Sequence, residues 1–435
     1  MKKSNYTSLA FKLIVFFAVT TYAMYLDITI ITNRISAALS LTFSFIFLYK
    51  CRKNVPLFIV AFFIFYCNYS IVVGEYFIGG NLGVPTEEIK TTEIYGLTIR
   101  VLLIFTSIVS LFFKSRIANI DNFRIIPRDN IIIFYGLLLV LIYIFLFGIN
   151  RGDFSTYTIS ITPMYEYSTI MFLVAYFFSG KSSIRRYLLI GIMFLFILQD
   201  FYYGGRITSL QLMILFLMLF LLERLSVKLI LLGGSIGIFL NSLIDVYRQQ
   251  YSLESINLIG VATNLVNNFF VFNTPVYAYH ASATHVAAEL LVTINDKINS
   301  FFMFLSHIFL GASNDMGDVT HYVKEHYFYN HGGGLIPSHF YFWLGWLGVI
   351  LISVIVVIIL NKLGSRNNHY LKIVTVTIIF SVPRWYLYTP LSLVRPVLIV
   401  SVLFIIFNIV HHIIKGSVGE QKNIDSSSLS VKNIQ

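Results

Sequence analysis

Charged residues are scarce in this chain of 435 residues, since only 12% of its positions are Asp, Glu, Lys or Arg. Soluble globular domains carry about twice that share. Hydrophobic residues make up 57% of the sequence, and apolar runs of about twenty residues, long enough to cross a ~30 Å hydrocarbon core, recur from end to end. The composition argues against a soluble domain and predicts an all-α integral membrane protein.

Cysteine is nearly absent, because Cys51 and Cys67 are the only two. They lie at opposite ends of one predicted span, so we expect no disulfide between them, and their spacing matches no metal motif. The nucleophile-elbow, zinc-protease and phosphate-loop motifs are also missing. A disulfide framework and the familiar hydrolase and nucleotide-binding sites are therefore not expected.

The apolar runs predict twelve membrane spans, with eleven or thirteen as alternatives. They cover residues of about 9–31, 35–50, 55–74, 96–113, 131–149, 163–179, 188–203, 207–223, 229–244, 339–360, 371–388 and 391–413.

Lysine and arginine indicate the orientation of these spans. With the N-terminus inside, twenty of the 31 basic residues fall in cytoplasmic segments and ten fall outside. The positive-inside rule therefore places both termini in the cytoplasm. The net charge of +11 is spread over these short connections, so it indicates topology, and no nucleic-acid partner is expected.

A long polar segment, residues 245–338, interrupts the pattern and faces outward in this topology. It separates nine spans in residues 1–244 from three spans in residues 339–413. The remaining residues, 414–435, are Ser-rich and polar and are expected to form a disordered cytoplasmic tail. An outward polar segment of this size is where a membrane enzyme would hold its catalytic groups.

Two apolar pieces inside the polar segment, residues 258–272 and 298–310, are too short to cross the membrane and are expected to be interfacial or re-entrant helices. Seven of the ten histidines lie in the segment or directly after it. Histidine is the usual general base near neutral pH, so His326 and His321 are candidate bases, with Glu325 as a competing carboxylate. The histidine pairs 280/285, 321/326 and 326/331 are each five residues apart, which does not fit a metal site on one helical face. Most of these histidines are expected to be structural.

Four arginines are predicted at or near the outer membrane surface: Arg206, Arg248, Arg384 and Arg395. Charge close to a bilayer usually has a partner or a function, and the planar guanidinium suits a phosphate group. Asp245 lies one helical turn before Arg248 and is expected to hold it, whereas Glu166 is isolated in the sequence. The alternative is that the arginines are snorkelling anchors or simple ion pairs.

A glycine run, Gly332-Gly333-Gly334, comes just before the tenth span. Its plain interpretation is a loop that approaches another segment closely or adopts positive φ; three N–H groups at a helix start would also favour an anion. Tyr341 and the aromatic residues after it are either an interfacial belt or a stacking surface for sugar rings.

In layout and in short motifs the chain resembles the O-antigen polymerases (Wzy-type), which are inner-membrane enzymes of the undecaprenyl-pyrophosphate pathway. The layout is twelve spans with both ends inside and one large periplasmic loop before the tenth. The local matches are Gly204-Gly205-Arg206, Tyr247-Arg248, the segment from Gly332 to Tyr341, and Gly345-Trp-Leu-Gly348.

The resemblance implies that a growing glycan is transferred from undecaprenyl pyrophosphate to the terminal sugar of a new lipid-linked repeat unit. Arg206 and Arg248, with Arg384 and Arg395, would bind the pyrophosphate, and the glycine run with Tyr341 would face the glycan. The partners implied are the undecaprenyl-pyrophosphate-linked oligosaccharide and membrane lipid, and whether a chain-length-regulating co-polymerase binds is left open. Neither a cofactor nor a metal is expected.

Three other functions fit parts of the sequence. An O-antigen ligase shares the layout and the donor. A flippase of the Wzx type would move the same lipid, but short loops and charges within many spans would be expected of it. A membrane O-acyltransferase would normally carry a catalytic His or Arg on the cytoplasmic or mid-membrane side.

Overall fold

The chain is almost entirely helical in the computed structural model, which describes residues 2–78, 89, 91–117, 119–150, 160–250, 257–310, 315–329, 332–365 and 368–431. Side chains are described within these ranges except at 2–8, 150, 160, 161, 248–250, 310, 315 and 414–431. The strands among these residues are β1 (Ile149–Asn150) and β2 (Ser160–Ile161), which form one short antiparallel pair. The predicted all-α class is confirmed.

The first half of the described chain contains α1 (Lys2–Tyr25), α2 (Ile30–Cys51), α3 (Val55–Ile71), the π-helical turn η1 (Val72–Phe77), α4 (Thr92–Phe112), the 3-10 turn η2 (Ile120–Asn122), α5 (Ile131–Phe147), α6 (Pro163–Glu166), α7 (Ser168–Phe178), α8 (Ser183–Tyr202) and α9 (Ile207–Phe220). The second half contains η3 (Leu222–Arg224), α10 (Val227–Gln250), α11 (Leu258–Asn267), α12 (Asn273–Glu289), α13 (Ile294–Leu310), η5 (Asp315–Gly317), α14 (Val319–His326), α15 (Ile336–Lys362), α16 (His369–Phe380), α17 (Val382–Leu387) and α18 (Leu391–Val431).

All twelve predicted spans contain helix, but those at about 9–31, 163–179 and 371–388 are each interrupted. Six of the described helices are long and apolar enough to cross a membrane. These six are Ile30–Cys51, Val55–Phe77, Thr92–Phe112, Val227–Tyr247, Ile336–Lys362 and Leu391–Ile413. The other predicted spans lie in shorter helices or, for α8, in a helix with charged residues at both ends. The structure therefore describes a membrane protein with at least six candidate spans.

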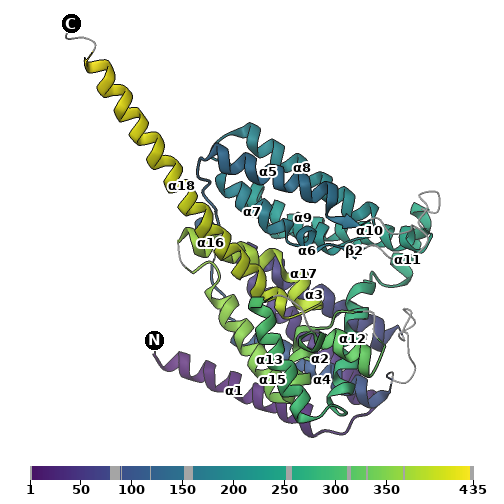
Figure 1. Cartoon of the computed structure of the whole chain (residues 1–435). Helices are drawn as coiled ribbons and strands as arrows, with labels where there is room; N and C mark the ends of the chain where they lie inside the picture. Colours follow the sequence, from purple (N-terminus) through teal and green to yellow (C-terminus); the bar gives the residue numbers. More distant parts are fainter. Residues whose placement is uncertain are drawn as a thin grey trace.

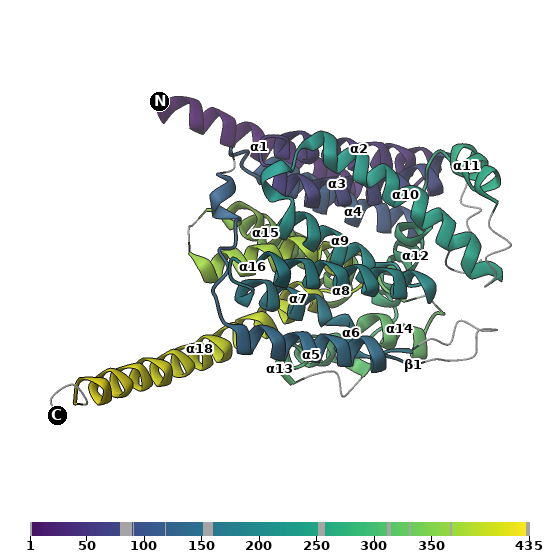
Figure 2. The same ribbon diagram turned by 90° about the horizontal axis from the view of Figure 1, so that it is seen from above.

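The helices form two blocks with α16 and α17 between them (Figure 1). One block, teal in the figure, holds α5 and α7 to α10; the other holds α1 to α4 with α12, α13 and α15. Both views place the N- and C-termini at one end of the bundle and α11 and α12 at the opposite end (Figures 1 and 2). We name the first the terminal end and the second the loop end.

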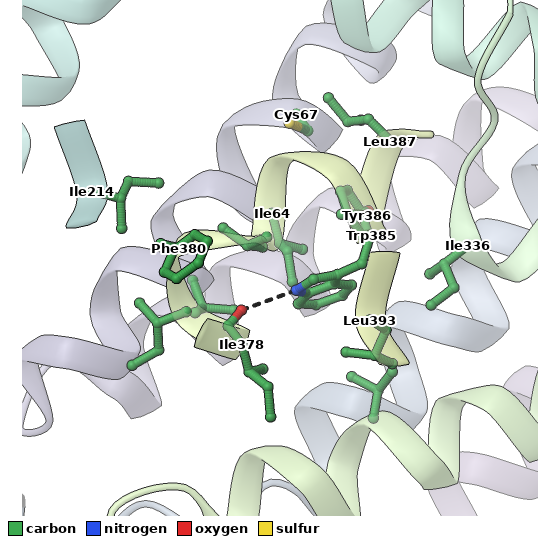
Figure 3. Close-up of a cluster of buried hydrophobic side chains, with 14 of the residues drawn as sticks. Ile64, Cys67, Ile214, Ile336, Ile378, Phe380, Trp385, Tyr386, Leu387 and Leu393 are labelled. Carbon is green, nitrogen blue, oxygen red and sulfur yellow. Dashed lines mark hydrogen bonds between the residues drawn. The ribbon is translucent and has the colours of Figure 1, made fainter. Parts of the chain in front are cut away.

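A break in the helix separates α16 from α17 at the centre of the bundle. Ser381 and Pro383 interrupt the helix, and Trp385 in α17 then folds back so that its indole N–H donates to the carbonyl of Ile378 at 3.1 Å (Figure 3). Tyr386 beside it is buried and donates from its hydroxyl to Asn68 of α3 at 2.6 Å. These two rings lock α17 in place and thereby position Arg384 next to them.

The polar segment differs from the expected loop with two short helices. Its expected apolar pieces are present as α11 and α13, but between them α12 lies inside the bundle and packs against α3, α4 and α15. Small residues such as Ala281 and Ala283 make up much of this helix and are fully buried, which permits the close approach. The segment therefore forms part of the core at the loop end.

The expectation of a disordered tail over residues 414–435 stays a prediction, although the backbone is helical as far as it is described. The backbone of α18 continues as one helix to Val431, beyond the predicted span that ends near residue 413. This helix projects from the terminal end of the bundle (Figure 1).

Candidate functional site

The turn between α8 and α9 is built around a buried carboxylate. Asp200 accepts hydrogen bonds from the backbone N–H of Ser209 at 2.8 Å and from its hydroxyl at 2.6 Å. Gly205 lies so close that a Cβ atom there would be 2.1 Å from the Asp200 carboxylate oxygen. Gly204 takes a positive φ of 74°, so both glycines are required by the turn. The residue that follows them, Arg206, is thereby held at the mouth of α9.

Arg206 joins three helices through its guanidinium. It forms an ion pair with Asp245 of α10, and its Nη1 lies 3.3 Å from the amide oxygen of Asn241 and 3.4 Å from the hydroxyl of Thr274 in α12. Its side chain is 12% exposed. Asp245, which was expected to hold Arg248, pairs with Arg206. The Arg248 side chain lies outside the described residues, so its expected contact with Asp245 stays a prediction.

Arg384 on α17 is held in the same manner. Its Nη1 lies 2.8 Å from a carboxylate oxygen of Glu166 at the end of α6, and its Nε donates to the side-chain oxygen of Gln211 in α9 at 3.2 Å. Its side chain is 21% exposed. Glu166 has no charged neighbour in the sequence, but in the structure it is the partner of a candidate arginine. The interpretation of Glu166 as an isolated residue is therefore wrong.

Arg206 and Arg384 both lie at the first two turns of α9. Arg206 directly precedes the first residue of α9, and Gln211, which binds Arg384, lies in its second turn. Arg395 is placed differently, because its guanidinium donates to the backbone carbonyl of His307 in α13. Two of the four predicted arginines therefore lie at the same end of α9, and a third, Arg395, lies at another helix pair. The side chain of the fourth is not described.

The candidate bases lie on α14, a short helix at the loop end (Figure 2). His321 and Glu325 are 46% and 48% exposed, with 3.4 Å between the Nδ1 atom and a carboxylate oxygen. His326 is also exposed, and its Nδ1 donates to the carbonyl of Tyr322 at 2.9 Å. That hydrogen bond fixes the tautomer in which Nε2 carries the lone pair, as a general base requires.

The glycine run is a docking loop. Gly332, Gly333 and Gly334 have φ values of 89°, 84° and 147°, and the N–H of Gly334 donates to the carbonyl of Leu387 at 2.9 Å. The next N–H, that of Leu335, donates to the hydroxyl of Ser282 in α12 at 2.8 Å. The plain interpretation of close approach is confirmed. An anion at this helix start would have to displace both hydrogen bonds.

Tyr341 lies inside the bundle and does not form a surface on which a sugar could stack. Its side chain is 5% exposed, and its ring packs edge-on against Trp346 at 5.0 Å. Trp343 is likewise buried and donates its indole N–H to the hydroxyl of Ser300 at 3.0 Å. Both alternatives drawn from the sequence, a belt and a stacking platform, are therefore corrected for Tyr341 and Trp343.

A buried cluster that the sequence did not indicate lies where α12 meets η1 and α4. Nε2 of His280 is 3.1 Å from a carboxylate oxygen of Glu75, and its Nδ1 contacts the hydroxyl of Tyr95. Glu75 and His280 are both nearly fully buried. Glu75 lies in the π-helical turn η1, a distortion that is frequent at functional sites. The two residues are 205 positions apart, so the sequence does not indicate that they pair. The one hint of a site in the sequence is that a carboxylate, Glu75, lies at the end of a predicted span.

No family model, curated protein or solved structure matches this chain.

The described residues contain no group of three or more His, Cys, Asp and Glu side chains placed to hold a metal ion. What they provide at the loop end is two guanidinium groups, each oriented by a carboxylate, and exposed imidazoles on α14. A carboxylate uses part of the five-donor fork of an arginine and leaves the other N–H groups for a ligand. The arrangement is suited to a phosphate-bearing substrate at the membrane surface.

Proposed function

We propose that this protein is a glycosyltransferase that polymerises lipid-linked oligosaccharide repeat units at the outer face of the bacterial inner membrane. The donor would be a glycan on undecaprenyl pyrophosphate, and the acceptor would be the terminal sugar of a new repeat unit on the same carrier. The observation that carries the proposal is the pair Arg206 and Arg384 at one end of α9, each held by a carboxylate.

In the proposed reaction an acceptor hydroxyl attacks the anomeric carbon of the donor. The bond between that carbon and the pyrophosphate oxygen breaks, and undecaprenyl pyrophosphate leaves with the electron pair. Arg206 and Arg384 neutralise the negative charge that develops on the leaving oxygen. Their salt bridges prevent the guanidinium groups from reorienting during the reaction, so less free energy is lost in placing them.

The hydroxyl proton goes to a base on α14. We assign this role to His326, because the Nδ1 hydrogen bond to Tyr322 leaves Nε2 as the basic atom. His321 with Glu325 is the second candidate. All three side chains are exposed at the loop end, where a sugar above the membrane could reach them.

The topology supports the same assignment. Both termini lie at one end of the bundle and α14 lies at the other (Figure 2), so cytoplasmic termini would put these bases outside. An inner-membrane protein of a Gram-negative bacterium with this orientation would meet lipid-linked glycans after their transfer across the membrane. Arg395 and Arg248 would lie near the donor without a described contact to the α9 site.

The test is the lipopolysaccharide ladder of a deletion strain complemented with wild type, Arg206→Ala or Arg384→Ala. We expect wild type to restore the ladder and both variants to leave core plus a single repeat. Arg224→Ala is the matched control, because Arg224 is an exposed arginine in η3. Membrane levels of every variant are measured by immunoblot.

Loss of Arg206 also removes the ion pair of the partly buried Asp245 carboxylate, which is destabilising in itself. The variant Arg206→Gln with Asp245→Asn removes both charges and separates the two effects. If this double variant accumulates normally and restores the ladder, Arg206 is only a structural ion pair. If the deletion strain loses even the single repeat, the function is that of a ligase when lipid-linked polymer accumulates, or of a flippase when lipid-linked single repeats do.

A further inference from the structure

A cavity of about 470 Å³ opens far from the α9 site, where the connections at the terminal end of the bundle meet. Its lining residues come from the α4–α5 connection, the α7–α8 connection, α8 and α16: Asp121, Arg124, Ile126, Pro127, Lys181, Arg186 and Lys372. Figure 2 shows the α4–α5 connection at the same end as both termini. The volume falls within the range of small-molecule sites, roughly 300–1,000 Å³.

Positive charge dominates this cavity. Four of the seven lining residues are cationic and one is acidic. Arg124 has a carboxylate partner, because its Nη1 lies 2.9 Å from Glu223. Within the described part of the chain Lys181, Arg186 and Lys372 form no ion pair, and the Nε atom of Arg186 is buried without a hydrogen-bond partner.

Lys372 is the most informative of these residues. Its side chain is only 4% exposed, and it lies in the first turn of α16. Burial disfavours an ammonium group, and the positive end of the helix dipole disfavours it further. Asp121 is the neighbouring counter-charge, and the positive charge of Arg124 opposes its effect on Lys372. The usual concentration of basic residues on a cytoplasmic face explains exposed lysines, but it does not explain a buried one.

Arg186 also lies in the first turn of a helix, here α8. Two helix N-termini therefore bring positive dipole ends and basic side chains to one cavity. Backbone hydrogen bonds hold its walls together, since the N–H of Gly180 donates to the carbonyl of Arg128 at 2.9 Å and that of Arg128 donates to Phe177 at 2.6 Å. A rigid cavity with excess positive charge is preorganised for an anion.

We propose that this cavity binds a phosphate group, supplied by the headgroup of an anionic lipid in the adjoining leaflet or by a soluble phosphate compound. Lys372 and Arg186 contact the phosphate from inside, and Lys181 closes it from the rim. Basic cavities between helices on this side of a membrane suit lipid headgroups, and Arg and Lys bind phosphate of either source. The site is separate from the Arg206 and Arg384 pair and does not depend on the proposed polymerase activity.

The experiment uses the purified full chain in a non-ionic detergent and measures its apparent melting temperature. In one arm inorganic phosphate replaces chloride at constant ionic strength. In the other arm phosphatidylglycerol is compared with phosphatidylcholine in mixed micelles, and native mass spectrometry counts the retained lipids. Lys181→Gln and Lys372→Gln alter the cavity. Lys53→Gln is the control, because it removes an exposed lysine outside the cavity.

We expect a saturable rise in melting temperature in one arm. Each cavity variant should raise the half-saturating concentration roughly tenfold, as expected for the loss of one hydrogen bond to a charged group, and Lys53→Gln should behave as wild type. A response to phosphate alone identifies a soluble ligand, and a response to phosphatidylglycerol alone identifies a lipid headgroup. No response, or the same response in all variants, overturns the proposal. If Lys372→Gln fails to fold, Lys181→Gln at the exposed rim still decides it.

Discussion

Asp245 and Arg206 lie 39 positions apart in the chain and share an ion pair at the mouth of α9. A single carboxylate cannot satisfy five guanidinium donors, so Arg206 also uses Asn241 and Thr274. Its Nε atom is buried and has no partner among the described residues. Three side chains therefore fix the position of Arg206, and only the exposed 12% of its side chain is open to a ligand.

His285 offers a separate test of a single residue. It is fully buried, with its Nδ1 atom 3.1 Å from the Ser338 hydroxyl and its Nε2 atom 3.3 Å from the Thr320 hydroxyl. Burial, with a smaller contribution from the neighbouring His339, lowers the pKa of His285 well below 6.5. In the unfolded chain a histidine has a pKa of about 6.5, so below that pH the unfolded state binds a proton that the folded state does not.

The stability contributed by neutral His285 is therefore present above about pH 6.5 and is lost as the pH falls below that value, by up to about 1.4 kcal/mol per pH unit. We expect the apparent melting temperature of wild type to fall between pH 7.5 and pH 5.5, and His285→Gln to show a shallower fall. His412→Gln, at an exposed position, should keep the wild-type slope. An unchanged slope in His285→Gln would show that other groups control the acid response.

At the scale of elements, the glycine run decides how α12, α14 and α17 meet. Thr320 of α14 donates its hydroxyl to the carbonyl of Gly333 at 2.7 Å, and the hydrogen bonds of Gly334 and Leu335 tie the same loop to α17 and α12. One short loop thus connects the helix with the candidate bases to the helix that carries Arg384. Its geometry sets the relative positions of the two groups.

A pair of alanine variants tests this element. A Cβ atom at Gly334 would lie 2.5 Å from Cε1 of His285, whereas at Gly332 it would meet nothing within 4 Å, and both residues have positive φ. Gly332→Ala should therefore cost only backbone strain, and Gly334→Ala should cost strain plus a clash, roughly 2 kcal/mol or more in total. Melting curves in detergent measure the difference. Equal losses in the two variants would mean that the loop does not pack as described.

At the scale of the whole molecule, the two ends of the bundle have different chemistry. The loop end holds the carboxylate-bound arginines and the exposed imidazoles, and the terminal end holds the cationic cavity. The proposed orientation places the first outside and the second in the cytoplasm. A negatively charged inner leaflet would therefore adjoin the cavity.

Thiol labelling tests this orientation directly. Cys51 and Cys67 are both fully buried, so the wild-type protein should react little with a maleimide. Labelling of an introduced cysteine can therefore be measured without removing the two native cysteines. Lys324→Cys lies on α14 and Lys53→Cys in the turn after α2, both at exposed positions. In spheroplasts an impermeant maleimide should label Lys324→Cys, and it should reach Lys53→Cys only after lysis. The reverse pattern would place the termini outside and contradict the proposed function.

Local patterns in the sequence were sufficient for the apolar helices that contain the predicted spans. Their positions follow from runs of apolar residues and from capping residues such as Asn54 and Asn130, whose side chains accept from the third residue of α3 and α5. Hydrogen bonding within each helix depends on neighbours only a few positions away. The glycine pair before Arg206 could be recognised for the same reason, because its turn is local.

What the sequence by itself determined is therefore the helical membrane class, the positions of the apolar helices and the residue types available for phosphate. The tertiary structure alone decided which carboxylate holds which arginine, that α12 is buried, and that His280 meets Glu75 across 205 positions. Ion pairs and packing between helices depend on how distant segments meet in space, and a buried charge is stable only where such a partner exists. Asp245 and Glu166 acquired their partners in that way.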